Sequence, residues 1–268
     1  MSLNAPIDCW QGRRVWLVGA SSGIGAALAC ALAQRGARLA LSARSGQGLE
    51  HCAERCRQCG ATDVSVHPMD VTRERDFFAV LGSLLGRWGG IDLVVFNAGT
   101  YRPQRAWELT PESVRETLDV NLVGVFDGVA TVLPMLLAQA ERGEPAALAI
   151  VGSVAGYRGL PRAVVYGPSK AALINLAECL YLDLAPRGVS VFLINPGFVA
   201  TGLTARNGFH MPALQTPEQA AEAIVHGFAR GRFEIHFPRR FTWAMKVLRL
   251  LPDRIAFWLL RKLTGAER

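Results

Sequence analysis

The sequence predicts an α/β fold in which a doubly wound parallel sheet of about seven strands is covered by helices on both faces. Short apolar runs alternate with stretches rich in alanine and leucine at helical spacing, which indicates repeated strand-helix-strand units. The runs at 93–96 and 147–151 are apolar at consecutive positions, as expected of strands buried on both sides. A glycine-rich turn joins the first run to an alanine-rich stretch. The expected strands lie at 14–19, 38–42, 64–67, 92–96, 147–152, 190–195 and, more weakly, 233–237.

The length and composition fit one globular domain with an appended segment. The chain has 268 residues, half of them apolar, and a mean hydropathy of +0.21, which excludes a disordered chain. A core of this size needs no disulfide or structural metal. Because no repeat or low-complexity linker divides the chain, residues 1–237 are predicted to form one domain. Residues 238–268 are predicted to add one or two basic, amphipathic helices in a C-terminal extension.

Positive charge is concentrated at the C-terminal end. Residues 238–268 hold eight basic and two acidic residues, whereas the preceding part holds 21 basic and 20 acidic residues. A nearly neutral body with a basic tail indicates contact with one surface, membrane or partner, and it disfavours nucleic-acid binding. The six cysteines and the absence of a signal-peptide profile favour the reducing cytoplasm. The uncharged run 15–34 is long enough for a membrane span, but glycines and serines interrupt it, so no transmembrane helix is predicted.

The first turn of the expected sheet has the composition of a phosphate-binding loop. Residues 14–18 lead into Gly19-Ala-Ser-Ser-Gly23-Ile-Gly25, and a helix follows to about Arg35. Glycines let the backbone turn sharply and approach a ligand, while the helix N-terminus offers unpaired N–H groups to a pyrophosphate. The G-x-x-x-G-x-G spacing departs from the commoner G-x-G-x-x-G, yet its context favours a dinucleotide site in a Rossmann-type fold. The alternative is a glycine turn that serves tight packing only.

The end of the second expected strand bears on the choice of dinucleotide. Residues 41–45 read Leu-Ser-Ala-Arg-Ser, so Arg44 stands where such folds meet the adenosine ribose. An acid there would accept a hydrogen bond from the 2′-hydroxyl, whereas arginine binds a 2′-phosphate. NADP(H) is therefore favoured, with NAD(H) as the alternative if Arg44 is simply solvated.

Three polar side chains form the pattern of an acid-base site. The strand 147–152 ends at Ser153, and Tyr166 and Lys170 lie four residues apart near the start of an expected helix. This spacing puts both side chains on one helical face, although such a pair alone is weak evidence. A phenol has a pKa of about 10 in water, and we expect the ammonium to favour the phenolate and lower that pKa toward neutrality. Ser153 would hydrogen-bond the reacting oxygen, and Lys170 would also reach the nicotinamide ribose.

With these motifs in order from about residue 12 to 237, the chain resembles the classical short-chain dehydrogenases/reductases. The resemblance implies that Ser153, Tyr166 and Lys170 are catalytic, together with Asn121, which would organise a water in a proton relay through Lys170. It also implies contacts with the adenine, the sheet edge and the nicotinamide. The implied cofactor-binding residues are Gly19, Ser21, Ser22, Gly23, Ile24 and Gly25 in the turn, then Arg44, Asp70, Val71, Asn97, Ala98, Gly99, Tyr166, Lys170, Pro196, Gly197 and Thr201.

The implied reaction is hydride transfer between the nicotinamide and a carbonyl carbon or secondary alcohol, with Tyr166 moving the proton. Two departures from the family pattern, Val18 and Phe96, stand at positions that tune packing rather than chemistry. Reduction is the favoured direction. The alternative function is a non-catalytic dinucleotide sensor or scaffold on the same fold, which the intact catalytic set disfavours.

The cysteines in the expected second helix suggest packing rather than metal binding. Cys52, Cys56 and Cys59 follow i, i+4, i+7 spacing, which places their thiols on one face toward the sheet. Structural zinc ligands normally come from loops with paired spacing, so no metal is predicted.

Two segments are expected to bind the substrate by the same resemblance: the stretch after Gly197 and the loop between the catalytic serine and tyrosine. Both are chiefly apolar, which weakly favours a lipophilic ketone or aldehyde over a small sugar. The same segments also carry Arg158, Arg162 and Arg206. The predicted substrate-binding residues are Ser153, Tyr157, Tyr166, Phe198, Phe209 and Met211.

Two kinds of surface contact are expected. The stretch 238–263 interleaves tryptophans and leucines with arginines, and a break at 251–253 makes each helix too short to span a bilayer. These helices either pack on the domain or on a second subunit, or they dock peripherally on a membrane. The resemblance also implies a homodimer or homotetramer through the helix that carries Tyr166, with contacts from Ala171, Ala172, Ile174, Leu176, Cys179 and Leu180.

Overall fold

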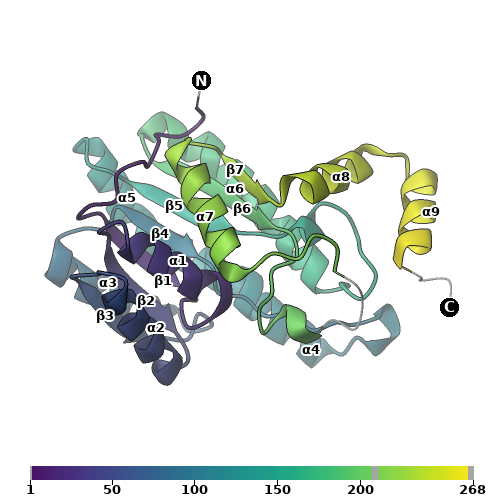
Figure 1. Ribbon diagram of the computed structural model, residues 1–268, viewed down its shortest axis with the longest axis horizontal. Helices are drawn as coiled ribbons and strands as arrows, with labels where there is room; N and C mark the ends of the chain where they lie inside the picture. Colours follow the sequence, from purple (N-terminus) through teal and green to yellow (C-terminus); the bar gives the residue numbers. More distant parts are fainter. Residues whose placement is uncertain (1, 207–210, 265–268) are drawn as a thin grey trace.

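Within residues 2–206 and 211–264, which the computed structural model describes, the chain has the predicted three-layer α/β architecture (Figure 1). Its strands are β1 (Arg14–Val18), β2 (Arg38–Ala43), β3 (Val64–Pro68), β4 (Leu93–Phe96), β5 (Ala147–Val151), β6 (Ser190–Pro196) and β7 (Glu234–Phe237). They form one parallel sheet in the order β3-β2-β1-β4-β5-β6-β7. The strand order reverses between β1 and β4, which confirms the doubly wound topology.

Helices cover both faces of this sheet. One face carries α1 (Gly23–Ala33), α2 (Gly46–Gln58) and α7 (Pro217–Ala229). The other carries α3 (Glu74–Trp88), α5 (Gly124–Glu141) and α6 (Tyr166–Leu184). The short α4 (Pro111–Leu118) precedes α5, and the extension consists of α8 (Arg239–Leu250) and α9 (Asp253–Thr264).

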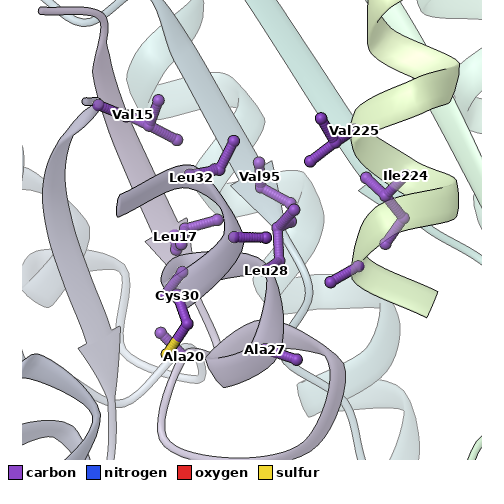
Figure 2. Close-up of a cluster of buried hydrophobic side chains, with 14 of the residues drawn as sticks. Val15, Leu17, Ala20, Ala27, Leu28, Cys30, Leu32, Val95, Ile224 and Val225 are labelled. Carbon is purple, nitrogen blue, oxygen red and sulfur yellow. The ribbon is translucent and has the colours of Figure 1, made fainter. Parts of the chain in front are cut away.

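Helix α1 packs closely because its side chains are small. Its sequence alternates alanines with leucines, and every residue from 25 to 33 is buried. Figure 2 shows side chains of β1, α1, β4 and α7 meeting in this layer, among them Leu17, Leu28, Val95 and Ile224. This packing fixes the N-terminus of α1 beside the carboxyl end of β1, where doubly wound folds bind ligands.

The cysteine prediction holds for two of the three thiols. Cys52 and Cys56 are buried in α2 against the sheet, and Cys30 of α1 belongs to the same core. Cys59 lies one residue past the end of α2 and is half-buried, because the helix stops at Gln58. In the part of the chain that the structure describes, no group of three or more His, Cys, Asp or Glu side chains could hold a metal ion.

One stretch with the composition of a membrane span belongs to the core. The helical stretch 111–141 contains an 18-residue window that is apolar enough to cross a membrane. Helix α5, which forms most of this stretch, buries Val125, Val129, Val132 and Leu136 against the sheet and α3. We therefore assign the stretch to the helical layer of the domain.

The C-terminal extension is only partly packed. In Figure 1, α8 and α9 project from the end of β7 to one side of the molecule. Met245, Leu248 and Ala256 are buried in the core that lies under α6. Arg158, which the sequence placed beside the substrate, instead forms an ion pair with Asp253. The exposed large apolar side chains of the extension are Trp243, Val247, Leu250, Ile255, Phe257, Trp258 and Leu263.

Candidate active site

A cleft of about 410 Å³ opens at the carboxyl ends of the central strands. It brings together the glycine turn after β1, the segment after β4, the end of β5, the first turn of α6 and the loop after β6. The side chains and backbone that line it include most of the predicted cofactor and catalytic residues. The lining residues are Gly19, Ser22, Gly23, Ile24, Asn97, Ala98, Gly99, Thr100, Val151, Gly152, Ser153, Tyr166, Lys170, Pro196, Gly197, Val199, Thr201, Gly202, Leu203 and Thr204.

The glycine turn has a shape that larger residues would not permit. Gly19 has a φ of +94°, and a Cβ there would overlap the backbone of Ala98. A Cβ at Gly25 would overlap the carbonyl oxygen of Gly19 and lie 2.6 Å from Asn97 Nδ2. That amide donates to the Gly19 oxygen at 2.7 Å, so Asn97 ties the turn to the end of β4.

The N-terminus of α1 fits the pyrophosphate of a dinucleotide. Ser22 is the N-cap, and its side chain makes no capping hydrogen bond, so the first-turn N–H groups are not satisfied by a side-chain cap. Gly23 has a φ of +57° and faces Thr201, whose Cγ2 would lie 3.0 Å from a Cβ at position 23. The uncapped N–H groups and the positive end of the helix dipole are the features that bind phosphate at helix N-termini.

The predicted adenosine contacts lie beyond this cleft, at the neighbouring strand ends. Arg44 is exposed directly after β2, and with Thr72 it helps to hold the pKa of the Asp70 carboxyl below its usual value. A Cβ at Gly48 would lie 3.1 Å from Cβ of Ser21, so the start of α2 adjoins the glycine turn. Val71 is buried at the end of the β3 segment. The structure therefore brings Ser21, Arg44 and Asp70 to one side of the turn.

The protonation of Tyr166 differs from the expectation. Burial is the main cause that raises the pKa of Tyr166 above its ordinary value; a hydrogen bond from Ser153 lowers it, and Tyr101 raises it further. Lys170 Nζ lies 5.8 Å from the centre of the Tyr166 ring and donates to the carbonyl oxygen of Val151 at 2.9 Å. The predicted lowering of the Tyr166 pKa is therefore wrong for this arrangement, because burial is the largest cause acting on the phenol and it raises the pKa. A protonated phenol is suited to donating a proton to a carbonyl oxygen.

Lys170 and Asn121 both adjoin the backbone of Gly99. A Cβ there would lie 3.4 Å from Asn121 Oδ1 and 3.6 Å from Lys170 Nζ. Asn121 lies in a single π-helical turn, Asp119–Val123, between α4 and α5. Its Oδ1 accepts from Thr100 N at 2.7 Å, and its Nδ2 donates to Thr100 O at 2.9 Å and to Ser169 Oγ at 3.2 Å. Such π-turns frequently mark functional sites.

The buried ammonium should give a pH-dependent stability. Burial lowers the pKa of Lys170 to about 8 from its ordinary value of 10.5. As pH rises from about 8 to about 10.5, the folded state loses this proton before the unfolded state, so the free energy of unfolding should rise by ~3 kcal/mol. Urea unfolding should show this rise in the wild type relative to Lys170→Met. The exposed Lys262→Met should retain the rise, and an equal rise in K170M would contradict the assignment.

Sequence reasoning missed one aromatic residue of the site. Tyr101 follows the Asn97-Ala98-Gly99 motif by two residues, and its ring packs edge-on against Tyr166 with centroids 4.8 Å apart. It contributes to the raised pKa of Tyr166. The only signal in the sequence was its short distance from the motif. Thr204 is a second cleft residue that the sequence did not indicate. Its hydroxyl accepts a hydrogen bond from Thr201 N at 3.0 Å within the cleft.

Several predicted substrate contacts lie elsewhere. Tyr157 is buried away from the cleft lining, and its hydroxyl donates to Glu234. Phe198 packs on Phe241 of α8 with ring centroids 5.4 Å apart, and neither it nor Met211 belongs to the described cleft lining. Phe209 lies outside the described residues. Ser153 and Tyr166 are the predicted substrate residues that the cleft brings together.

Comparison with known proteins relates most of the chain to one family. Residues 13–210 match the family model for short chain dehydrogenases. The chain is 36% identical to an uncharacterized oxidoreductase of Myxococcus xanthus, over 90% of this chain and 93% of that protein. It is 32% identical to an 11-beta-hydroxysteroid dehydrogenase-like protein of Arabidopsis thaliana, over 93% of this chain and 80% of that protein. A 3-dehydrosphinganine reductase of Arabidopsis thaliana is also 32% identical, over 93% of this chain and 78% of that protein.

Solved structures show the same fold. A short chain dehydrogenase/reductase from Burkholderia phymatum, in complex with NAD, has a TM-score of 0.80 and 26% identity over 90% of this chain and 94% of that chain. An alcohol dehydrogenase from Thermococcus sibiricus, complexed with 5-hydroxy-NADP, has a TM-score of 0.75 and 29% identity over 85% of this chain and 96% of that chain. The cofactors in these structures are nicotinamide dinucleotides of both kinds.

Proposed function

Because the chain belongs to the short-chain dehydrogenase/reductase family, we propose that it is an NADP(H)-dependent oxidoreductase that reduces a lipophilic ketone or aldehyde. The observation that carries this proposal is the convergence of Ser153, Tyr166 and Lys170 on one cleft with the glycine turn. A scaffold without catalysis would not need this set of side chains.

Each polar group has a role in proton movement. The cofactor would supply the hydride chemistry, with the glycine turn holding its pyrophosphate and Pro196, Gly197 and Thr201 bordering its nicotinamide. Ser153 orients the carbonyl oxygen, and the Tyr166 hydroxyl donates its proton to that oxygen. The Lys170 ammonium stabilises the phenolate that this transfer leaves. Asn121 holds the backbone of Thr100 beside this path, where a water could connect Lys170 with solvent.

The preference for NADP(H) rests on charge near the start of α2. Ser45 caps α2 by accepting from Gly48 N at 3.1 Å, and Arg44 directly precedes it. An arginine beside a helix N-terminus favours a ribose 2′-phosphate over a hydroxyl. Asp70 lies near Arg44 and offsets part of its charge, so the proposal depends on a guanidinium that can turn toward the phosphate.

Arg44→Asp should reverse the cofactor preference. The carboxylate would repel the 2′-phosphate, so kcat/KM with NADPH should fall about 100-fold while kcat/KM with NADH changes little. Steady-state kinetics with both cofactors measures the ratio. Arg57→Asp, the same exchange at an exposed position near the other end of the adjoining helix α2, is the matched control and should leave the ratio unchanged. Equal efficiency of the wild type with NADPH and NADH would contradict the preference.

The substrate proposal follows from apolar residues of the same cleft. Val199 and Leu203 line the cleft together with Tyr166. The named relatives, a hydroxysteroid dehydrogenase-like protein and a 3-dehydrosphinganine reductase, support a lipid-like ketone. A panel of aliphatic ketones, aldehydes and ketosteroids assayed with NADPH tests this. Turnover of small polar sugars alone would overturn it.

We also propose that the extension docks on an anionic bilayer. Trp243 and Trp258 are each 57% exposed, and several cations lie on the same two helices. Apolar side chains with interleaved cations match a lipid interface, whereas the single acidic residue of α8 and α9, Asp253, is paired with Arg158. The location would then be cytoplasmic and peripheral to the membrane.

Vesicle binding tests this docking. The protein should co-sediment with phosphatidylserine-containing vesicles and less with neutral ones, because the cations contribute to binding. Trp243→Ala or Trp258→Ala should weaken binding about tenfold, since each removes a large exposed apolar group that the bilayer would bury. Trp107→Ala alters an exposed tryptophan outside the extension and should have no effect. Absence of co-sedimentation with anionic vesicles would exclude docking.

A homodimer or homotetramer through α6 remains part of the proposal. Ala171 and Cys179 are exposed on α6, as an interface requires. Ile174, in contrast, is buried against Gly156 within the subunit and is removed from the predicted contact set. Sedimentation equilibrium gives the number of subunits.

A further inference from the structure

A half-buried polar cluster joins the C-terminal extension to the loop that carries Ser153. Glu234, the first residue of β7, accepts hydrogen bonds from Tyr157 and from Asn195 Nδ2, the latter at 2.8 Å. Its other carboxylate oxygen accepts from Lys246 Nζ of α8 at 2.5 Å. The cleft lining does not include Glu234, Tyr157, Asn195 or Lys246, and the mechanism above uses none of them. A half-buried carboxylate with three donors is held in one position.

One arm of the cluster reaches the residue before Ser153. Asn195 is fully buried on β6, and its Oδ1 has no hydrogen-bond partner among the described residues. A Cβ on Gly152 would overlap this oxygen, so the amide occupies the space beside Gly152. Because Glu234 binds the Nδ2 of the same amide, it orients Asn195 with its oxygen toward Gly152.

The other arm reaches the residues after Ser153. The Ser153 hydroxyl accepts from Ala155 N at 3.1 Å and caps the short 3-10 turn Val154–Gly156. Tyr157 ends that turn, and its hydroxyl is held by Glu234. Glu234 therefore contacts both sides of the loop, one through Asn195 and the other through Tyr157.

We propose that Glu234 is a positioning residue that holds Ser153 in hydrogen-bond reach of Tyr166, and that Lys246 of α8 keeps Glu234 in place. The inference rests on the catalytic assignment of Ser153 in the proposed function. It makes α8 a structural requirement of the active site, in addition to any contact that it makes with a membrane.

Charged and polar groups surround both Glu234 and Tyr166. Glu234 faces Tyr157, Asn195 and Lys246, and His236 and Arg249 lie close enough to act on the cluster by charge. Tyr166 faces Ser153 and Tyr101 and shares a helix with Lys170. Among the described residues, the hydrogen bonds of Glu234 go to Tyr157, Asn195 and Lys246, and the side chains that act on the Tyr166 hydroxyl are Ser153 and Tyr101, so we expect an effect of Glu234 on Tyr166 to pass through Ser153.

NMR of the full chain labelled with ¹³C at the tyrosine Cζ carbon tests the proposal without a substrate. The chain has four tyrosines, and Tyr166→Phe identifies the Tyr166 signal. Ser153→Ala defines the shift that follows loss of the serine hydrogen bond. In Glu234→Gln, the Tyr157 signal should move because its acceptor changes, and the Tyr166 signal should move toward its S153A position. The Tyr181 hydroxyl donates to Leu3 O, and its ring packs on Phe233, the residue before Glu234, with centroids 5.1 Å apart, so an unmoved Tyr181 signal shows that E234Q leaves the surrounding packing intact.

Two further variants complete the test. Glu144→Gln makes the same chemical change in an exposed ion pair with Arg142 and should leave all four signals in place. Tyr157→Phe removes one arm without altering charge, and it replaces E234Q if that variant does not fold. A Tyr166 signal that stays at its wild-type position in the folded variant would overturn the proposal, even if the enzyme reduces ketones as proposed. A shifted signal in a protein without turnover would instead refute the proposed function alone.

Discussion

Tyr166→Phe should lower turnover by about 1,000-fold while changing the affinity for NADP(H) by no more than about twofold. The ring remains, so its edge-on contact with Tyr101 at 4.8 Å between centroids is preserved. Only the hydroxyl that accepts from Ser153 and donates to the substrate is lost. The hydroxyl lies at the end of the cleft where Ser153 and Lys170 converge, and no other described phenol lines that cleft.

Single-turnover reduction and NADPH fluorescence titration separate the two effects. Tyr181→Phe provides a matched control, because it removes a hydroxyl whose described partner is the carbonyl of Leu3, away from the cleft. That variant should retain wild-type turnover. Activity of Y166F near that of the wild type would refute the assignment of Tyr166 as the acid, and a parallel loss of NADPH binding would indicate a defect in the cofactor site instead.

The raised pKa of Tyr166 favours reduction over oxidation at neutral pH. A phenol that stays protonated at neutral pH can donate to a carbonyl oxygen without prior uptake of a proton, which suits reduction. Alcohol oxidation requires the phenolate, so its rate should increase as pH rises toward the pKa of Tyr166. The ammonium of Lys170, with its pKa lowered to about 8, loses its charge at a lower pH than Tyr166 loses its proton.

The strands were predictable because burial on both faces of the sheet requires apolar residues at consecutive positions in the sequence. The runs 93–96 and 147–151 are apolar without interruption, and β4 and β5 have these bounds in the structure. The glycine turn was predictable for a similar reason, since Gly19 and Gly25 have no side chain in places where a Cβ would overlap neighbouring backbone. Both signals depend on residues that are near one another in the sequence.

Contacts between segments that are distant in the sequence could not be predicted from local patterns. Tyr157 looked like a substrate residue because it follows Ser153 closely, but its partner Glu234 lies 77 residues further along the chain. The pKa of Tyr166 was predicted from its i, i+4 neighbour Lys170, whereas burial by the assembled fold decides its direction. The extension was recognised as helical from its composition. Its attachment through Lys246 depends on a carboxylate in β7 that no local pattern identified.

Gly25→Ala should both destabilise the fold and abolish tight cofactor binding. The added Cβ would overlap the Gly19 carbonyl oxygen and lie 2.6 Å from Asn97 Nδ2, so the 2.7 Å hydrogen bond between these two groups must break or the turn must move. Overpacking of this kind lowers the free energy of unfolding by about 1–3 kcal/mol. Displacement of the first turn of α1 also moves the N–H groups that bind the pyrophosphate, so NADPH affinity should fall about 100-fold, equivalent to ~3 kcal/mol.

A glycine-to-alanine substitution in α3 shows how much of the effect of G25A comes from steric overlap and how much from helix propensity. Gly82→Ala lies on the exposed side of α3, where a Cβ meets nothing within 4 Å. Alanine is the better helix former by about 0.5–1 kcal/mol, so G82A should be neutral or slightly more stable and should bind NADPH normally. Urea unfolding and fluorescence titration of both variants measure the contrast. Wild-type NADPH affinity in G25A would mean that the turn after β1 does not hold the pyrophosphate, because the backbone there cannot accept a Cβ and keep its shape.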